Sequence, residues 1–112
     1  MRKITSVLLG SVVVMGLFST SASASIKKGS KLYLKNCKKC HGNGAKGAAM
    51  HTQAEWLKFF ENDAAALVEA HKSDEKAMKF FNKKKFKTKY APNLKDFLHE
   101  YGSDSGNVPS CG

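Results

Sequence analysis

The sequence predicts an all-α fold, and three observations support this prediction. Apolar residues recur at helical spacing near both ends of the mature chain, and capping residues stand where helices would begin. No stretch alternates apolar and polar residues for long enough to form a convincing strand. We expect three to five short helices in one small domain, because the 112 residues leave only 88 once a 24-residue signal is removed. A core of that size usually needs help from disulfides, a metal or a bound cofactor.

The chain opens with the three parts of an export signal. Arg2 and Lys3 give a positive start, residues 4–18 are mostly apolar, and Ala22-Ser23-Ala24 fits a small-x-small cleavage site. The apolar run is short of the ~20 residues of a membrane-spanning helix, and an uncleaved anchor is the alternative. We therefore expect a bacterial exported protein of the periplasm, with no stable membrane insertion after cleavage.

The chain then divides into three parts: a signal peptide at 1–24, a single domain at 25–102 and a polar C-terminal tail at 103–112. The first helix of the domain is expected from Ile26 to about Lys39. A loop is expected to follow at 42–47, because this stretch is too rich in Gly for regular structure.

Capping residues predict three short helices in the middle of the chain. Thr52 and Glu55 fit a capping box, Asp63 is the expected cap of the second helix, and Ser73 is that of the third. Apolar faces accompany these caps: Trp56, Phe59 and Phe60 in the first helix, Leu67 and Val68 in the second, and Met78 and Phe81 in the third.

The last helix is expected to follow a lysine-rich connection at 83–89. Pro92 suits its first turn, and Gly102 suits its end. Its apolar face repeats at i, i+3, i+4 and i+7 through Leu94, Phe97, Leu98 and Tyr101.

The most specific motif is Cys37-Lys38-Lys39-Cys40-His41, a C-x-x-C-H pattern typical of covalent haem c attachment. Two thiols add to the two vinyl groups of the porphyrin, and a helical turn gives the spacing between them. The adjacent His41 then binds the iron through a neutral imidazole. We therefore predict one haem c, with its iron, per chain. The export signal strengthens this prediction, because haem is attached outside the cytoplasm.

Three other uses of this motif are less well supported. A redox C-x-x-C pair would need a thioredoxin-like β-α-β pattern, which is not visible. A zinc site would need four ligands, but no second C-x-x-C or H-x-x-x-H follows. A plain disulfide between Cys37 and Cys40 would leave His41 without a role. Cys111 is the third cysteine, and it is either a free thiol of the tail, a dimer link or a bond to another protein.

The chain resembles a monohaem class I c-type cytochrome from about Lys27 to Tyr101. In that family, a Gly and an aromatic residue precede the first haem Cys by eight and four residues, as Gly29 and Tyr33 do here. The resemblance implies that the N- and C-terminal helices cross, with Leu94, Phe97 and Leu98 packed on Gly29. It also implies a cytochrome c-like fold built around one covalent haem.

The resemblance implies a Met on the far side of the iron, and Met78 has the best position for it. A thioether suits an iron that is six-coordinate in both oxidation states. Met78 departs from the family pattern, however, because it lies in a predicted helix rather than an extended loop. The alternatives are Met50, one of the histidines His51, His71 and His99, or an open site.

The function that we expect is periplasmic electron transfer through haem c, not catalysis by the chain itself. The alternatives are a haem c subunit of a larger oxidoreductase complex and an open-site haem sensor that binds a ligand. The partners would be larger redox proteins with acidic docking surfaces, because the mature chain has a formal charge of +8 once Arg2 and Lys3 are removed. A solvated basic face is the simpler explanation of that charge. Nucleic acid is a poor partner for an exported protein.

Overall fold

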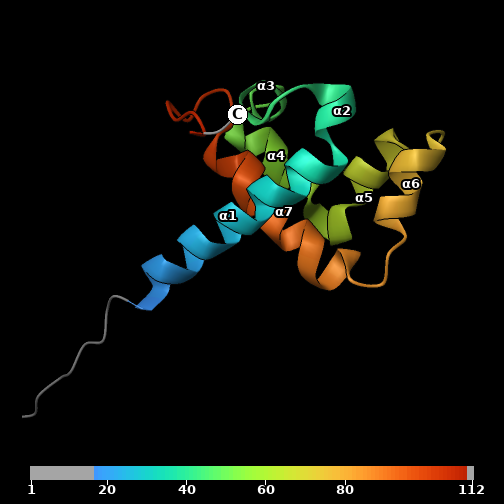
Figure 1. Ribbon diagram of the computed structural model, residues 1–112, viewed down its shortest axis with the longest axis horizontal. Helices are drawn as coiled ribbons and strands as arrows, with labels where there is room; N and C mark the ends of the chain where they lie inside the picture. Colours follow the sequence, from blue (N-terminus) through green and yellow to red (C-terminus); the bar gives the residue numbers. More distant parts are fainter. Residues whose placement is uncertain (1–16, 111–112) are drawn as a thin grey trace, which may run out of the picture.

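The computed structural model describes residues 17–110, with side chains from Ser23 onward (Figure 1). Residues 1–16 of the predicted signal peptide and Cys111 of the tail lie outside the described residues. The described part contains α-helices and one π-helix but no strand, which confirms the all-α prediction. The elements in order are α1 (Leu17–Asn36), α2 (Lys38–His41), α3 (Gly44–Ala48), α4 (Gln53–Phe59), α5 (Glu61–Ala70), α6 (Glu75–Phe81), the π-helix η1 (Phe86–Tyr90) and α7 (Ala91–Glu100).

The crossing of α1 and α7 organises the fold (Figure 1). Gly29 is buried at the crossing, where a methyl group would clash with the carbonyl oxygen of Asn93 and lie 2.7 Å from Cβ of Phe97. The rings of Tyr33 and Phe97 pack beside it with their centroids 5.7 Å apart. The core includes Leu94 and Phe97, each 1% exposed. The predicted helix crossing at Gly29 is therefore confirmed.

Helix α1 differs from its predicted bounds at both ends. It begins at Leu17 rather than Ile26, because the small residues around the predicted cleavage site include no helix breaker. It ends at Asn36, and Cys37 forms a turn that separates it from α2. The predicted helix from Ile26 to Lys39 is therefore two helices, one reason why the count exceeds three to five.

The prediction of a loop at 42–47 holds only for Gly42 and Asn43 and was wrong from Gly44 onward, because Gly44–Ala48 forms the short helix α3. The side chain of Asn43 caps this helix by accepting a hydrogen bond from the N–H of Lys46 at 2.9 Å. Gly47 is buried against Tyr33, and a methyl group there would lie 2.6 Å from Cε2 of that ring. The absence of side chains allows this close packing, which outweighs the poor helix propensity of Gly.

The predicted capping box at the start of α4 is confirmed. Thr52 accepts a hydrogen bond from the N–H of Glu55 at 3.2 Å, and Glu55 accepts one from the N–H of Thr52 at 2.9 Å. The caps predicted for the next two helices were wrong. The carboxylate of Asp74, not Ser73, caps α6 through the N–H groups of Lys76 and Ala77.

Asp63 does not cap α5 but belongs to a left-handed turn within it. Three consecutive residues, Asn62, Asp63 and Ala64, have φ between 54° and 63°. Ala64 is fully buried, so this turn is fixed by packing against the core. The turn redirects the chain between α4 and the right-handed part of α5.

The lysine-rich connection at 83–89 contains a core residue, Phe86, which its charged composition did not lead us to expect. Phe86 begins η1 and is 1% exposed, with its ring 5.5 Å from that of Phe80 and 5.1 Å from that of Phe81. The N–H of Tyr90 bonds to the carbonyl of Lys85 at 3.1 Å, the i+5 pattern of a π-helix. This segment therefore connects α6 to α7 through the core.

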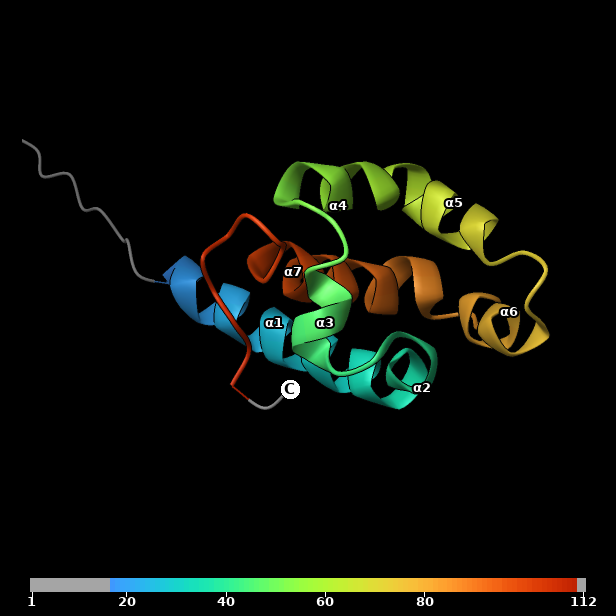
Figure 2. The ribbon, with the colours of Figure 1, turned by 90° about the horizontal axis from the view of Figure 1, so that it is seen from above.

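Helices α4, α5 and α6 follow one another in an arc on the side of α7 away from α1 (Figure 2). Part of the predicted tail packs against the start of α4. The carboxylate of Asp104 accepts a hydrogen bond from the N–H of Gln53 at 2.8 Å, and the N–H of Ser103 donates to the backbone carbonyl of His51 at 2.9 Å. The buried indole of Trp56 donates to the carbonyl of Ala48 at 2.7 Å, which joins α4 to α3.

Candidate haem attachment site

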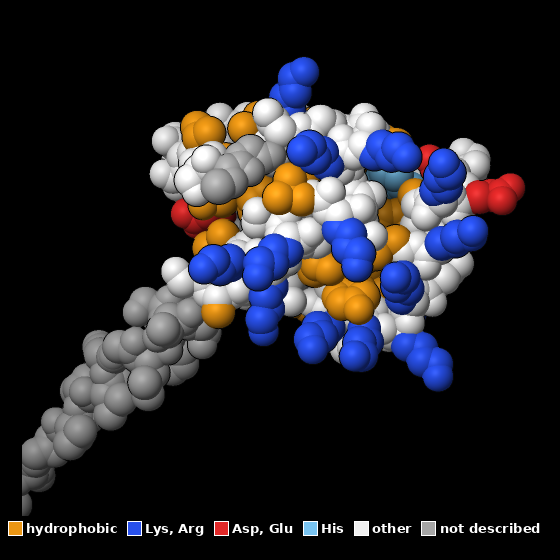
Figure 3. Space-filling model, viewed as in Figure 1, with side chains coloured by type: hydrophobic (Ala, Val, Ile, Leu, Met, Phe, Trp, Pro, Cys, Tyr) orange, Lys and Arg blue, Asp and Glu red, His pale blue; other side chains and the backbone are white. Residues whose placement is uncertain are grey.

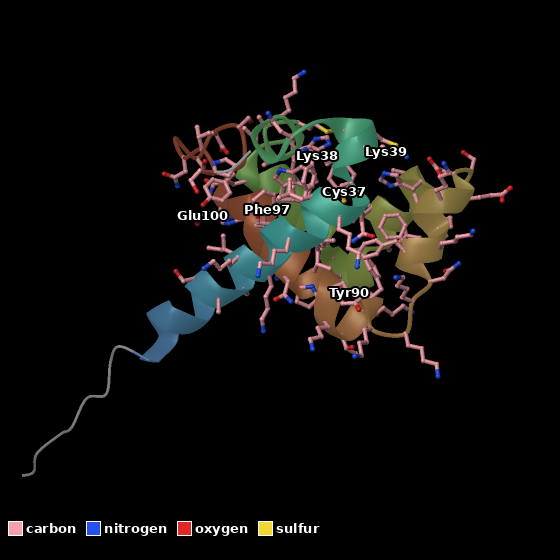
Figure 4. The ribbon with its side chains drawn as sticks, in the orientation of Figure 1. Cys37, Lys38, Lys39, Tyr90, Phe97 and Glu100 are labelled. Carbon is pink, nitrogen blue, oxygen red and sulfur yellow. The ribbon has the colours of Figure 1, made fainter. Side chains whose placement is uncertain are left out.

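The C-x-x-C-H motif consists of Cys37, which forms the turn after α1, and the four residues of α2. The N–H groups of Cys40 and His41 both donate to the carbonyl of Cys37, at 3.2 and 3.0 Å. Because residues three apart in a helical turn lie on one face, this turn brings the two cysteines to the same side. Figure 4 shows Cys37 at the end of α1, with Lys38 and Lys39 on α2.

The phenol of Tyr33 fixes the segment that follows the motif. Its hydroxyl donates to the carbonyls of Gly42 and Asn43 at 2.7 and 3.2 Å, and the side chain is 3% exposed. Burial, and secondarily the nearby Cys37, raise the pKa of Tyr33 to about 12, so the phenol stays a donor. The sequence singled out Tyr33 as the aromatic residue four positions before Cys37 but gave no sign of these hydrogen bonds, because the acceptors are backbone atoms.

Both thiols of the motif are free, with no disulfide between them. Cys37 is half-buried and Cys40 is exposed. Burial, together with the neighbouring Cys40, raises the pKa of Cys37 to about 12, so this group is a neutral thiol. Two adjacent, unpaired thiols followed by a histidine are the groups that thioether attachment requires.

His41 ends α2 and is half-buried. Among the residues that the structure describes, neither ring nitrogen has a hydrogen-bond partner. The pKa of His41 is lowered by burial and, to a smaller extent, by the His71 ring, which lies 5.8 Å away between centroids. A lowered pKa favours the neutral imidazole, which is the form that binds iron.

The other predicted or alternative iron ligands are spread over the molecule. Met78 lies on α6, in a helix as the sequence predicted, and is half-buried. Its role as an iron ligand stays a prediction. Met50 is 49% exposed. His51 packs on Trp56 with ring centroids 4.8 Å apart, and His99 lies near the end of α7.

The residues present fit a covalently attached haem. In the part of the chain that the structure describes, no group of three or more His, Cys, Asp or Glu is placed so that it could hold a metal ion. The donor set is instead two thiols and one neutral imidazole in a single turn. Cys37 and Cys40 would hold the porphyrin, and His41 would bind the iron, which would supply a one-electron redox centre.

A helical domain with crossed terminal helices and a C-x-x-C-H turn defines the chain as a c-type cytochrome. The model of the family described as "Cytochrome C oxidase, cbb3-type, subunit III" matches residues 24–98, and the chain belongs to this family. Membership implies covalently bound haem c and electron transfer through its iron. No curated protein and no solved structure matches the chain significantly. Among the described helices, none has the length and apolar character needed to cross a membrane.

Exposed lysines surround the motif and much of the surface. Figure 3 shows them spread over the face that carries α1, with few acidic side chains among them. Within residues 23–110, only Lys72 pairs with a carboxylate, that of Glu69 at 2.6 Å. Lys38 and Lys39 are exposed and lie inside the motif itself. The positive charge beside the attachment turn is therefore not neutralised by ion pairs with any side chain of residues 23–110.

Proposed function

We propose that this protein is a periplasmic electron carrier with one haem c, attached through Cys37 and Cys40 and bound at the iron by His41. The observation that supports this most directly is the pair of free thiols and the adjacent imidazole of His41 in one turn. Cys37 and Cys40 would attach the haem and His41 would bind its iron, while the crossed helices α1 and α7 support the attachment turn. Electron exchange needs no catalytic acid or base from the chain, so it is not an enzyme by itself.

Haem attachment is tested with the full chain, expressed in bacteria that carry the haem c maturation system. The expected product keeps its haem in a denaturing gel and has a reduced-minus-oxidised c-type spectrum. Cys37→Ala and Cys40→Ala should each leave one thioether, and the double variant should lose covalent haem. Serine replacement of Cys111 is the matched control and should retain full haem content. A periplasmic product without covalent haem would contradict the proposal.

The docking surface is proposed to be the lysine-rich face around the motif, which would steer acidic redox partners. The expected on-rate to an acidic partner falls as ionic strength rises, because long-range attraction between charges is screened. The double variant Lys38→Glu/Lys39→Glu should slow electron exchange by about tenfold or more at low salt. Lys27→Glu/Lys28→Glu makes the same charge change roughly 15 Å away along α1 and should have a smaller effect.

The second candidate function is a haem c subunit of a larger oxidoreductase. The matched family, named for an oxidase subunit, favours this alternative. A carrier should purify from periplasm as a lone soluble protein and should reduce several acceptors. A subunit should co-purify in a fixed ratio with a catalytic partner, in a complex that persists at high salt.

A further inference from the structure

The ring of His71 lies beside the ring of the predicted iron ligand His41, although thirty residues separate them in the chain. Their centroids are 5.8 Å apart, and their planes are nearly perpendicular at 83°. Two imidazoles that bind one metal from opposite sides, each at about 2.0 Å, have ring centres roughly 6 Å apart. The observed separation is therefore close to that of two ligands on one iron.

The hydrogen bond of His71 leaves its Nε2 atom available to bind a metal. Nδ1 lies 2.7 Å from the carbonyl oxygen of Leu67, one turn earlier in α5. A carbonyl can only accept, so Nδ1 carries the proton and Nε2 carries the lone pair. A backbone carbonyl that binds the second nitrogen is the usual support of a metal-bound histidine, because it fixes the tautomer and the orientation of the ring.

Packing holds the same ring from a second direction. Phe81 of α6 lies against His71 with ring centroids 5.2 Å apart and planes at 58°. Phe81 is itself held by Phe86 at 5.1 Å and Phe80 at 5.6 Å. The imidazole of His71 is thus fixed by a hydrogen bond from α5 and by an aromatic cluster that continues into the core.

The remaining candidates lack this combination. His51 contacts Trp56 and Phe59 and lies 3.6 Å from the carboxylate of Glu55, so it belongs to the α4 end of the fold. Met50 is half exposed. Met78 lies one turn before Phe81 on α6, in a helix rather than in the extended loop of related cytochromes. Among the described histidines, His71 alone has its ring in contact with that of His41.

We infer that His71 is the second axial ligand of the haem iron, opposite His41, so that the centre is bis-histidine rather than histidine–methionine. This inference rests on the proposed haem attachment. It also has a consequence for the partners. Methionine ligation raises the reduction potential of haem c, so a bis-histidine centre would have a lower potential than a histidine–methionine carrier. Its partners would then be low-potential donors and acceptors.

The test uses the purified full chain with haem attached. Haem content, measured first by haem staining and the pyridine haemochrome, decides whether haem is attached at all. The ligand is then read from the ferric protein by electron paramagnetic resonance and near-infrared spectroscopy. We expect a low-spin bis-imidazole signature and no methionine–iron charge-transfer band. A methionine band in the wild-type protein would overturn the inference while leaving haem attachment intact.

Variants separate His71 from Met78. His71→Ala should give high-spin ferric haem, fast carbon monoxide binding by the ferrous form, and recovery of the low-spin state on addition of imidazole. His71→Met should raise the reduction potential and create the methionine band. Met78→Leu and His51→Ala should leave the wild-type signature unchanged. A changed axial signature in Met78→Leu, or an unchanged one in His71→Ala, would refute the assignment.

Discussion

Gly29 of α1 lies in direct contact with Asn93 of α7, and the two backbones meet there without a side chain between them. A methyl group at Gly29 would clash with the Asn93 carbonyl oxygen and lie 2.8 Å from its carbonyl carbon. This contact sets how closely the helices cross, and therefore how Tyr33 and Phe97 pack behind the attachment turn. The crossing connects the last helix of the chain to the site formed by the first two.

Gly29→Ala is expected to destabilise the holoprotein by about 1–3 kcal/mol, since the extra methyl forces the two helices apart. Helix propensity alone would make the Ala variant about 1 kcal/mol more stable than wild type. A loss of stability therefore shows that the clash at the crossing outweighs helix propensity. Thermal unfolding followed by far-ultraviolet circular dichroism measures the change. Lys31→Ala, an exposed change two residues away, should shift stability by less than about 0.5 kcal/mol. A Gly29→Ala protein as stable as wild type would show that the crossing tolerates a wider separation.

Tyr33→Phe is expected to cost about 1–2 kcal/mol, because the buried hydroxyl that joins α1 to the carbonyls of Gly42 and Asn43 is lost. The segment after His41 should become more mobile, which hydrogen exchange at residues 42–47 would detect. Tyr101→Phe is the matched control, since no hydrogen bond of its hydroxyl is found in the described part of the chain. Equal losses in the two variants would argue against a specific role for the Tyr33 hydroxyl.

The left-handed turn before the right-handed part of α5 can be tested by an ordered series at Asp63, which is exposed with φ of 58°. Glycine adopts this conformation without steric cost, whereas a β-branched residue does not. Asp63→Gly should therefore raise stability by up to about 1 kcal/mol and Asp63→Val should lower it by about 1–2 kcal/mol. Glu61→Gly, at a neighbouring exposed position, should lower stability. A destabilised Asp63→Gly protein would contradict the left-handed geometry.

Features with local causes could be predicted from the sequence, and those that depend on packing could not. The Thr52–Glu55 capping box was predicted because it follows from two residues at fixed spacing, whereas the crossing at Gly29 was implied by the family resemblance. The helix at Gly44–Ala48 was missed because burial against Tyr33 reverses the local preference of Gly. Phe86 was missed because the lysines around it indicate a solvated connection.

The candidate site divides in the same way. The C-x-x-C-H motif predicted Cys37, Cys40 and His41 as the haem-binding residues, since their chemistry is contained in five consecutive positions. No local motif in the sequence identifies the second axial ligand, which would bind the iron on the side opposite His41. The contact between His41 and His71 depends on how α5 and α6 curve back towards α2, which helical periodicity does not reveal.

The capping box of α4 is expected to make stability depend on pH in the acidic range. The N–H of Thr52 donates to Glu55, and this hydrogen bond is the main reason that the pKa of Glu55 lies below its ordinary value of 4.5. His51, whose Nδ1 lies 3.6 Å from the same carboxylate, adds to the lowering. Since the folded-state pKa is the lower one, the stabilisation is complete above the unfolded-state value and is lost as pH falls through the folded-state value.

Glu55→Gln keeps a hydrogen-bond acceptor at the third position of the box but removes the charge. Its melting temperature should therefore lie below that of wild type at neutral pH, and the difference should shrink as the pH falls below about 4. Thermal melts of the two holoproteins across this range measure the difference, and effects of acid on the haem ligands cancel in the comparison. Glu61→Gln, at an exposed position without side-chain hydrogen bonds in the described structure, should show no such convergence with wild type. A difference between wild type and Glu55→Gln that stays constant from neutral to acidic pH would mean that the charge of Glu55 does not stabilise the start of α4.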